Sequence, residues 1–343
     1  MIAKLALFGV LQLVAVWAPM PAVAAPGEQP VTRVIHVGPT KAIKTIAAAA
    51  RLAGAGTTIL VDSGTYLADV AVWSQDGVSL RAVGGRVKLV AAGAAAEDKA
   101  IWVVRAKDLH VEGFDFEGAA VPSRNGAGIR LETGSLYVYD CTFKHNEMGL
   151  LTNNDVNTEL EISNSEFAHN QRPDGHNHNL YVGQIARLSV TGSYFHHART
   201  GHLLKSRAAV NRISNNRIAD EVGGTASYEL EFPNGGIAYV DDNFIAQNTS
   251  TENPILISFG AEGYKWPRNE IHLINNTLVN HLSSGGVFLR VAPGADSIRA
   301  VDNSLVGSGT LESAGPGEYS NNIKRDVTQD LESRPPKLLP YRR

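Results

Sequence analysis

Ile213-Ser214-Asn215-Asn216-Arg217-Ile218 is one copy of a six-residue pattern that recurs through most of this 343-residue chain. An apolar residue opens each copy, a second closes it five positions later, and small or amide residues lie between them. The closing residues of successive copies stand 23 to 33 residues apart, with the longest interval between Ile245 and Leu278. The eight copies span residues 111–116, 138–143, 162–167, 190–195, 213–218, 240–245, 273–278 and 300–305.

A period near 25 residues with short strands predicts a solenoid in which each repeat is one coil. Three short strands fill such a unit, so we predict an all-β, right-handed parallel β-helix over residues 33–323. Leucine-rich repeats would need a helix or a regular leucine ladder in each unit. Propeller blades would be longer, with antiparallel strands and tight hairpin turns.

One position inside the pattern forms a column of small and amide side chains. Stacked coils put the third residue after each opening residue in register, where asparagine amides can hydrogen-bond from coil to coil. We therefore interpret the asparagines as structural and Cys141 as a buried packing residue. The column consists of Phe114, Cys141, Ser165, Ser193, Asn216, Asn243, Asn276 and Asn303.

The two ends of the chain differ from the repeat. Residues 1–24 have the pattern of a signal peptide: Lys4, an apolar run and small residues ending at Ala24. This predicts export to the periplasm or the medium, with no membrane span once the signal is removed. Apolar residues at near-helical spacing between Ile43 and Leu52 predict an N-terminal capping helix over the open end of the stack. Residues 324–343 lack the period and are assigned to a C-terminal tail.

Composition excludes some partners and bonds. The formal net charge of -3 gives no reason to expect nucleic acid as a partner. Cys141 is the single cysteine, so no intramolecular disulfide can form. Stability must therefore come from stacking and hydrogen bonding.

The densest group of ionisable side chains lies between residues 174 and 207, which hold five of the eleven histidines. Alternate residues of a strand face opposite sides, and Leu180, Leu204 and Leu230 are assigned to the interior. Their neighbours then face outward, while three histidines stand at the entries to the same strands. The outward residues are Tyr181, Leu203, Lys205, Glu229 and Glu231, and the histidines are His176, His178 and His202.

These groups suit the chemistry of a uronic acid polymer. Abstraction of the proton at C5 of a uronate needs a base, a cation that neutralises the adjacent carboxylate, and an acid for the leaving oxygen. We predict Lys205 as the base, with Tyr181 and either His178 or His202 as acid or second base. Arg207 or a bound calcium ion would neutralise the carboxylate.

A wider set of residues is expected to bind the substrate. The longest repeat interval implies an inserted loop that contains Tyr264, Lys265, Trp266 and Arg268, able to close over an anionic sugar. The substrate-binding candidates are His176, Asn179, Glu229, Glu231, Lys265 and Trp266.

The capping helix, the coil length and the asparagine column resemble the pectate-lyase-like β-helix superfamily over residues 34–325. Most of its members act on acidic polysaccharides, which implies an anionic polysaccharide as partner. Residues 201–207 followed by Asn215-Asn216 are similar to the coil that carries the lysine base in the alginate lyase and chondroitinase B family. Asp174 and His176 ahead of Leu180-Tyr181 resemble mannuronan C5-epimerases. The arginine acid of those lyases has no counterpart in residues 229–234, and the epimerase Asp-Pro-His-Asp motif is only partly present in residues 172–176.

Metal binding is a second use for the same side chains. His176, His178 and His202 could form a three-histidine zinc or copper site, and Glu229 with Glu231 could bind calcium, which is kept as a candidate cofactor. His196 and His197 are interpreted as surface residues.

We therefore predict an exported enzyme that acts on a uronate-containing polymer as a β-elimination lyase or a C5-epimerase. The alternative is a non-catalytic glycan-binding or envelope polysaccharide assembly protein. A hydrolase of the polygalacturonase type ranks third: Glu229 with Glu231 or Asp220 could supply the paired carboxylates that it needs, but the usual aspartate clusters are missing.

Overall fold

A computed structural model describes residues 33–172, 174–175, 177–311 and 314–327 of the chain. The predicted signal peptide and most of the predicted tail lie outside these residues. Apart from the helix α1 (Ile46–Leu52), every named element of the described chain is a β-strand. No helix in the described part is long and apolar enough to cross a membrane.

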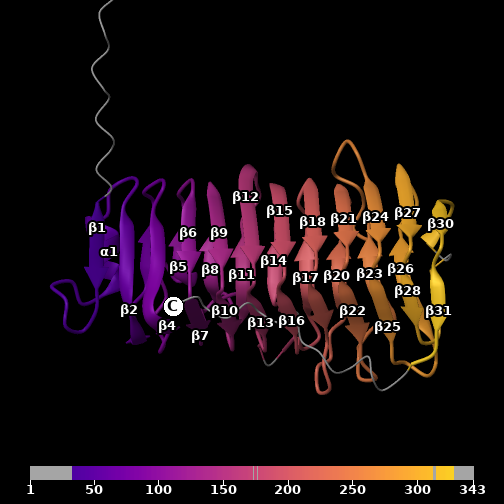
Figure 1. Cartoon of the computed structure of the whole chain (residues 1–343), viewed down its shortest axis with the longest axis horizontal. Helices are drawn as coiled ribbons and strands as arrows, with labels where there is room; N and C mark the ends of the chain where they lie inside the picture. The colour runs from indigo at the N-terminus through magenta and orange to yellow at the C-terminus, as the bar shows by residue number, and fades with distance from the viewer. Residues whose placement is uncertain (1–32, 173, 176, 312–313, 328–343) are drawn as a thin grey trace, which may run out of the picture. The chain divides into compact units, whose positions relative to one another are not determined.

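The strands stack in three parallel columns, one strand from each column in nearly every coil (Figure 1). The first column consists of β1 (Val34–Val37), β2 (Thr58–Leu67), β4 (Ser79–Val90), β6 (Leu109–Glu112), β9 (Ser135–Tyr139), β12 (Asp155–Ser163), β15 (Ile185–Thr191), β18 (Val210–Ser214), β21 (Ile237–Asp241), β24 (Glu270–Ile274), β27 (Ser297–Val301) and β30 (Glu318–Ser320). The second column consists of β7 (Phe114–Glu117), β10 (Thr142–Lys144), β13 (Glu166–Ala168), β16 (Tyr194–His196), β19 (Arg217–Ala219), β22 (Phe244–Gln247), β25 (Thr277–Asn280), β28 (Ser304–Val306) and β31 (Ile323–Arg325).

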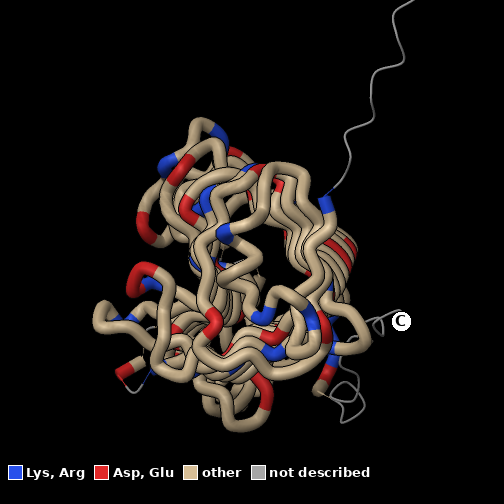
Figure 2. The backbone as a smooth tube through the Cα atoms, turned by 90° about the vertical axis from the view of Figure 1, so that its left-hand side faces the viewer, with Lys and Arg blue, Asp and Glu red and all other residues tan. Residues whose placement is uncertain are grey.

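The third column is a separate sheet of ten strands. It consists of β3 (Ala71–Trp73), β5 (Ala100–Val104), β8 (Ala127–Leu131), β11 (Met148–Thr152), β14 (Leu180–Val182), β17 (His202–Ser206), β20 (Tyr228–Phe232), β23 (Ile255–Phe259), β26 (Gly286–Val291) and β29 (Gly309–Thr310). Seen from the end of the stack, successive coils overlie one another (Figure 2). This arrangement is the predicted parallel β-helix.

The sequence repeat predicts the strand register. The closing residues of the pattern pair from coil to coil, from Phe116 with Phe143 through to Leu278 with Leu305. Four of them are phenylalanines whose rings stack in the interior at centroid distances of 4.9, 4.6 and 4.8 Å. The apolar repeat therefore forms the continuous core, as expected.

The predicted asparagine column is a hydrogen-bonded ladder. The side-chain oxygen of Asn243 accepts from the backbone N–H of Asn216 at 2.9 Å, and that of Asn276 accepts from Asn243 at 3.0 Å. The ladder extends from Cys141 to Asn322, and its buried side chains satisfy the backbone groups that turn the corner between the first two columns. The structural interpretation of these asparagines and the burial of Cys141 are confirmed.

The turn before each ladder residue explains the choice of side chains there. Asn164, Asn215, Asp242 and Asn275 have φ between 48° and 58°, in the left-handed region that Asn, Asp and Gly tolerate best. This conformation recurs just before the ladder residue in these coils, so they turn at the same point.

Helix α1 lies at the first coil. Thr45 caps it, and both oxygens of the buried Asp69 accept its first backbone N–H groups, from Ile46 at 2.6 Å and Ala47 at 2.8 Å. A carboxylate at a helix N-terminus is favourable because it satisfies donors that have no partner within the helix. That this helix shields the end of the stack stays a prediction.

Candidate functional site

The outer face of the third column carries a row of side chains in register. Tyr181 of β14 pairs with Lys205 of β17, and Lys205 pairs with Glu231 of β20, as the sequence predicts. Neighbouring strands of a sheet lie about 4.8 Å apart, so these three side chains are adjacent. The row contains Arg130, Leu151, Tyr181, Lys205, Glu231, Ser258 and Arg290, and it begins two coils before Arg130 with Val72 and Val103.

Lys205 lies between two carboxylates. Its Nζ atom is 2.9 Å from Glu231 Oε2 and 2.9 Å from Glu262 Oε1. Lys205 is 9% exposed and Glu231 is 3% exposed, so both charges are largely removed from water. Charges buried to this extent persist in proteins when they are paired.

His202 shares the same carboxylate. Its Nδ1 atom lies 3.0 Å from Glu231 Oε2. Burial lowers the pKa of His202 below 6.5, although Glu231 opposes the shift, so the ring is neutral at pH 7. Burial would raise the pKa of Glu231, but His202 and Lys205 outweigh that effect and lower it. The result is a neutral imidazole beside an ionised carboxylate.

His178 packs against both His202 and Tyr181. Its Nδ1 atom accepts the backbone N–H of His202 at 2.9 Å. Because a backbone N–H can only donate, the neutral ring of His178 must carry its proton on Nε2. The ring centroids of His178 and Tyr181 are 5.4 Å apart with an angle of 17° between the planes, and those of His178 and His202 are 4.6 Å apart.

Arg207 follows β17 and joins the group from the other side. It donates to the Tyr181 hydroxyl at 2.7 Å and to both oxygens of Glu262 at 2.9 and 2.7 Å. These bonds and those from Lys205 lower the pKa of Glu262, although its partial burial would raise it. Lys205 and Arg207 thus both pair with the carboxylate of Glu262, a residue of the same chain.

Glu262 belongs to the predicted inserted loop, which lies between β23 and β24. Trp266 is half-buried and donates its indole N–H to the backbone carbonyl of Arg207 at 3.0 Å, whereas Lys265 is exposed. The loop therefore contacts the end of β17, and Glu262 rather than Lys265 reaches the cluster.

A cavity of about 670 Å³ opens beside these residues. This volume lies within the range of about 300–1,000 Å³ that is usual for small-molecule pockets. It is lined by His178, Thr200, His202, Lys205, Ser227, Glu252, Asn253 and Pro254.

Two predicted outward residues, Glu229 and Leu203, face the interior. Both are 0% exposed, and the strand register places them in one row with Leu256 and Phe288. The prediction is wrong because strict alternation fails at the start of β17: His202 and Lys205 both contact Glu231, while Leu203 and Leu204 between them both enter the core. Glu229 therefore cannot share a calcium ion or a pair of hydrolytic carboxylates with Glu231.

Asn179 also lies inside. It is 0% exposed and belongs to a second amide ladder, in which Asn170 donates to it at 2.9 Å and it donates to the carbonyl of His196 at 2.8 Å. Its side chain does not reach the outer face, which contradicts the prediction that it binds substrate. His176 falls outside the described residues.

In the predicted three-histidine site, the Nδ1 atoms of His178 and His202 already have neighbours within the chain. His178 Nδ1 is occupied by a backbone N–H, and His202 Nδ1 faces Glu231.

Sequence reasoning missed Glu262 and Arg130. Arg130 could have been found from the register, since it occupies the outward row two strands before Tyr181. No pattern in the sequence points to Glu262, because a loop residue has no periodic position.

Comparison with known proteins finds likeness in fold rather than in sequence. No family model and no curated protein matches the sequence. The pectin methylesterase of Aspergillus niger in its deglycosylated form aligns with a TM-score of 0.47 and 15% identity over 88% of this chain and 94% of that chain. The pectate lyase Pel9A aligns with a TM-score of 0.42 and 13% identity over 79% of each chain.

A mutant of the PL6 family alginate lyase AlyGC aligns with a TM-score of 0.41 and 15% identity, over 89% of this chain but 39% of that chain. The chain resembles the pectate-lyase-like β-helix proteins. At these identities the likeness concerns the fold alone, and function must be argued from the site.

Proposed function

We propose that the protein is a polysaccharide-active enzyme that abstracts the C5 proton of a uronate polymer at the outer face of the third column. The observation that supports this most strongly is the compact group of Lys205, His202, Glu231 and His178 beside the cavity. Together with Arg207, it offers two cations and a neutral imidazole oriented by a carboxylate. The cations and the imidazole each have a role in the abstraction of the C5 proton.

Lys205 and Arg207 are proposed to bind the substrate carboxylate. Both residues pair with the carboxylate of Glu262 in the structure, Lys205 at 2.9 Å and Arg207 at 2.7 Å, which supports this role. An arginine fork and a lysine charge stabilise the negative charge that develops on the carboxylate as the C5 proton leaves. Lys205 would then serve as a cation, in place of the base role that the sequence suggests.

His202 is proposed as the base. Glu231 beside Nδ1 favours the tautomer with its proton on that atom, which leaves Nε2 free to accept a proton. His178, whose neutral ring carries its proton on Nε2, is proposed as the acid, with Tyr181 as the other candidate. The network resembles the general scheme in which a carboxylate orients an imidazole.

The proposed reaction starts with transfer of the C5 proton to His202, which leaves an enolate-like carboxylate. In a lyase the C4–O bond then breaks, a C4=C5 double bond forms, and the leaving oxygen takes a proton from His178 or Tyr181. In an epimerase the same acid returns a proton to the opposite face of C5. Because both reactions share the first step, both require the same base.

The Lys205→Arg and His202→Gln variants test these roles. Arginine retains the charge but cannot act as a base, so Lys205→Arg should keep measurable activity while its KM rises. His202→Gln should lose roughly 10²–10⁴-fold in kcat. The readouts are the ultraviolet absorbance of an unsaturated uronate and proton exchange at C5. Complete loss in folded Lys205→Arg with retention in His202→Gln would return the base to Lys205.

A non-catalytic glycan-binding protein is the alternative. It predicts that the protein binds a uronate polymer through Lys205 and Arg207 without chemical change. We further propose that the protein acts in the periplasm or the medium, as the signal-like residues 1–24 predict; secretion of the full-length chain and N-terminal sequencing of the mature protein test this.

A further inference from the structure

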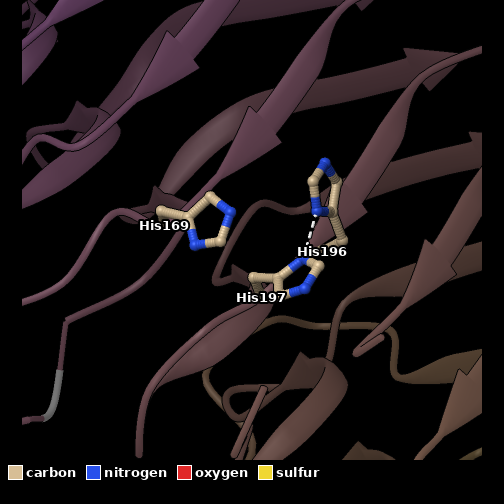
Figure 3. A group of neighbouring side chains, drawn as sticks. All are labelled: His169, His196 and His197. Atoms are coloured by element: carbon tan, nitrogen blue, oxygen red, sulfur yellow. Dashed lines mark hydrogen bonds between the residues drawn. The ribbon is translucent and has the colours of Figure 1, made fainter. Parts of the chain in front are cut away.

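Three histidines come together in the turn between the second and third columns, and none of the three lines the proposed cavity. His169 follows β13, His196 ends β16, and His197 comes next in the chain. One ring nitrogen from each lies within 4.8 Å of the others. Figure 3 shows the ring of His169 on one side of a shared space, with His196 and His197 on the other.

One backbone position carries a histidine in three successive coils. His169 and His197 occupy the position just after the paired residues Ala168 and His196, and both have positive φ, 55° and 50°. His145 occupies the same position one coil earlier, with φ of 57°. The ring of His169 stacks on that of His197 at 4.5 Å and on that of His145 at 5.3 Å. Left-handed backbone is uncommon for residues other than glycine, and here it aligns three imidazoles in successive coils.

We propose that His169, His196 and His197 bind a divalent transition-metal ion of the zinc or copper class. Imidazole nitrogen suits these ions, whereas calcium and magnesium prefer oxygen ligands. Three imidazoles would leave a further coordination position for water or another ligand. The ion would tie the coil of His169 to the coil of His196 and His197.

The hydrogen bonds of the cluster orient its ring nitrogens. His196 Nε2 lies 2.9 Å from Glu166 Oε1, and a carboxylate can only accept, so this nitrogen carries the proton. The Nδ1 atoms of His196 and His197 form a hydrogen bond of 2.5 Å, in which the tautomers decide which nitrogen donates. A metal ion bound by both atoms would take the place of this hydrogen bond and of the proton that it holds.

A metal ion requires a small movement of these rings. With bond lengths of roughly 2.0–2.1 Å in a tetrahedral zinc site, two ligand nitrogens stand roughly 3.3 Å apart. The rings of His196 and His197 must therefore separate slightly, and His169 must approach. His169 and His197 are only half-buried, which gives their side chains room to rotate.

The charges around the cluster are compatible with a cation. Glu166 accepts from His196 in the manner of the carboxylates that orient metal-bound histidines. Lys144 opposes the ion, but it is paired with Glu166 at 2.8 Å.

Cobalt(II) and zinc(II) binding to protein purified without a polyhistidine tag tests the proposal. After chelator treatment and dialysis, we expect one ion per chain, a cobalt absorption spectrum of a low-coordinate nitrogen site, and a zinc-dependent rise in Tm. His169→Asn and His197→Asn keep a residue that tolerates left-handed backbone and should each abolish the cobalt spectrum. Glu166→Gln should weaken zinc binding roughly 10–100-fold.

His145→Asn is the matched control, because it changes the same backbone position one coil away and should alter zinc affinity less than about twofold. Circular dichroism establishes that each variant is folded. No saturable binding, or equal losses in His145→Asn and His169→Asn, would overturn the proposal.

Discussion

The single residue that departs furthest from the repeat is Glu229. It lies in a row with Leu203, Leu256 and Phe288, and neither of its carboxylate oxygens has a hydrogen-bond partner among the described residues. Burial and the nearby charge of Asp220 raise the pKa of Glu229 well above 4.5. An acid in this environment is protonated far more readily in the folded chain than in the unfolded chain.

The pH dependence of stability should therefore change in Glu229→Gln. A raised folded-state pKa gives stability that is complete below the unfolded value of 4.5 and is lost as the pH rises toward the folded value. Gln cannot ionise, so the variant should match the natural protein near pH 4 and exceed it at pH 8, by about 1.4 kcal/mol for each unit of pKa difference. Denaturant unfolding at both pH values measures this.

Exposed Glu161 provides the control, since Glu161→Gln should leave the pH profile nearly unchanged. A Glu229→Gln variant less stable than the natural protein at both pH values would show that Glu229 is ionised and paired in solution.

His202 gives a second prediction at this scale. Because burial lowers its pKa below 6.5, activity should fall as the solution is acidified and His202 becomes protonated, with a midpoint below 6.5 in kcat/KM. Glu231→Gln removes the carboxylate that opposes this shift, so the midpoint should move to lower pH still. A midpoint above 6.5, or one that does not move in Glu231→Gln, would contradict the base role of His202.

Among the structural elements, the asparagine ladder offers the best test of what holds neighbouring coils together. Asn243 donates to the carbonyl of Ile213 at 2.8 Å and accepts from the backbone of Asn216. Asn243→Ala leaves these buried groups unpaired and should destabilise the protein by about 3 kcal/mol. Exposed Asn157→Ala should cost less than about 0.5 kcal/mol. Equal effects of the two substitutions on denaturant unfolding would refute the ladder as a source of stability.

The inserted loop gives a prediction about binding. Glu262 holds the two cations that we assign to the substrate carboxylate, so it competes with substrate. Glu262→Gln removes the competing charge and should lower the Kd for a uronate oligosaccharide by up to about fivefold, the range of a partly exposed ion pair. Calorimetric titration measures the change, with Glu161→Gln as control, because Glu161 is exposed and does not line the cavity. Weaker binding by Glu262→Gln would mean that this residue orients Lys205 and Arg207 instead.

The elements also show what a sequence can and cannot predict here. The register of the core and the role of the asparagines follow from a repeat, because every coil makes the same contacts. The interior position of Glu229 does not follow from the repeat, because the inward–outward alternation of side chains breaks near the start of β17 and β20. The contact of Glu262 with Lys205 depends on how a non-repeating loop folds back, and the cluster of His169, His196 and His197 depends on two coils meeting at a turn.

In the molecule as a whole, the stacking of similar coils places equivalent residues of successive coils in rows. The outer row of the third column includes Arg130, Lys205 and Arg290, along the direction in which the coils stack. A chain-like anion lying along that direction would meet cations on several coils. Polymers should therefore bind more tightly than monosaccharides, which is the reason to assay long substrates first.

Proton exchange at C5 tests the central claim most directly. Uronate polymers that the mature protein binds are incubated with it in deuterated water, and magnetic resonance follows the C5 position and any unsaturated product. The account predicts deuterium at C5 or a C4=C5 double bond, with loss of either signal in His202→Gln. Binding without exchange or elimination on any of those polymers would contradict it and leave a glycan-binding protein.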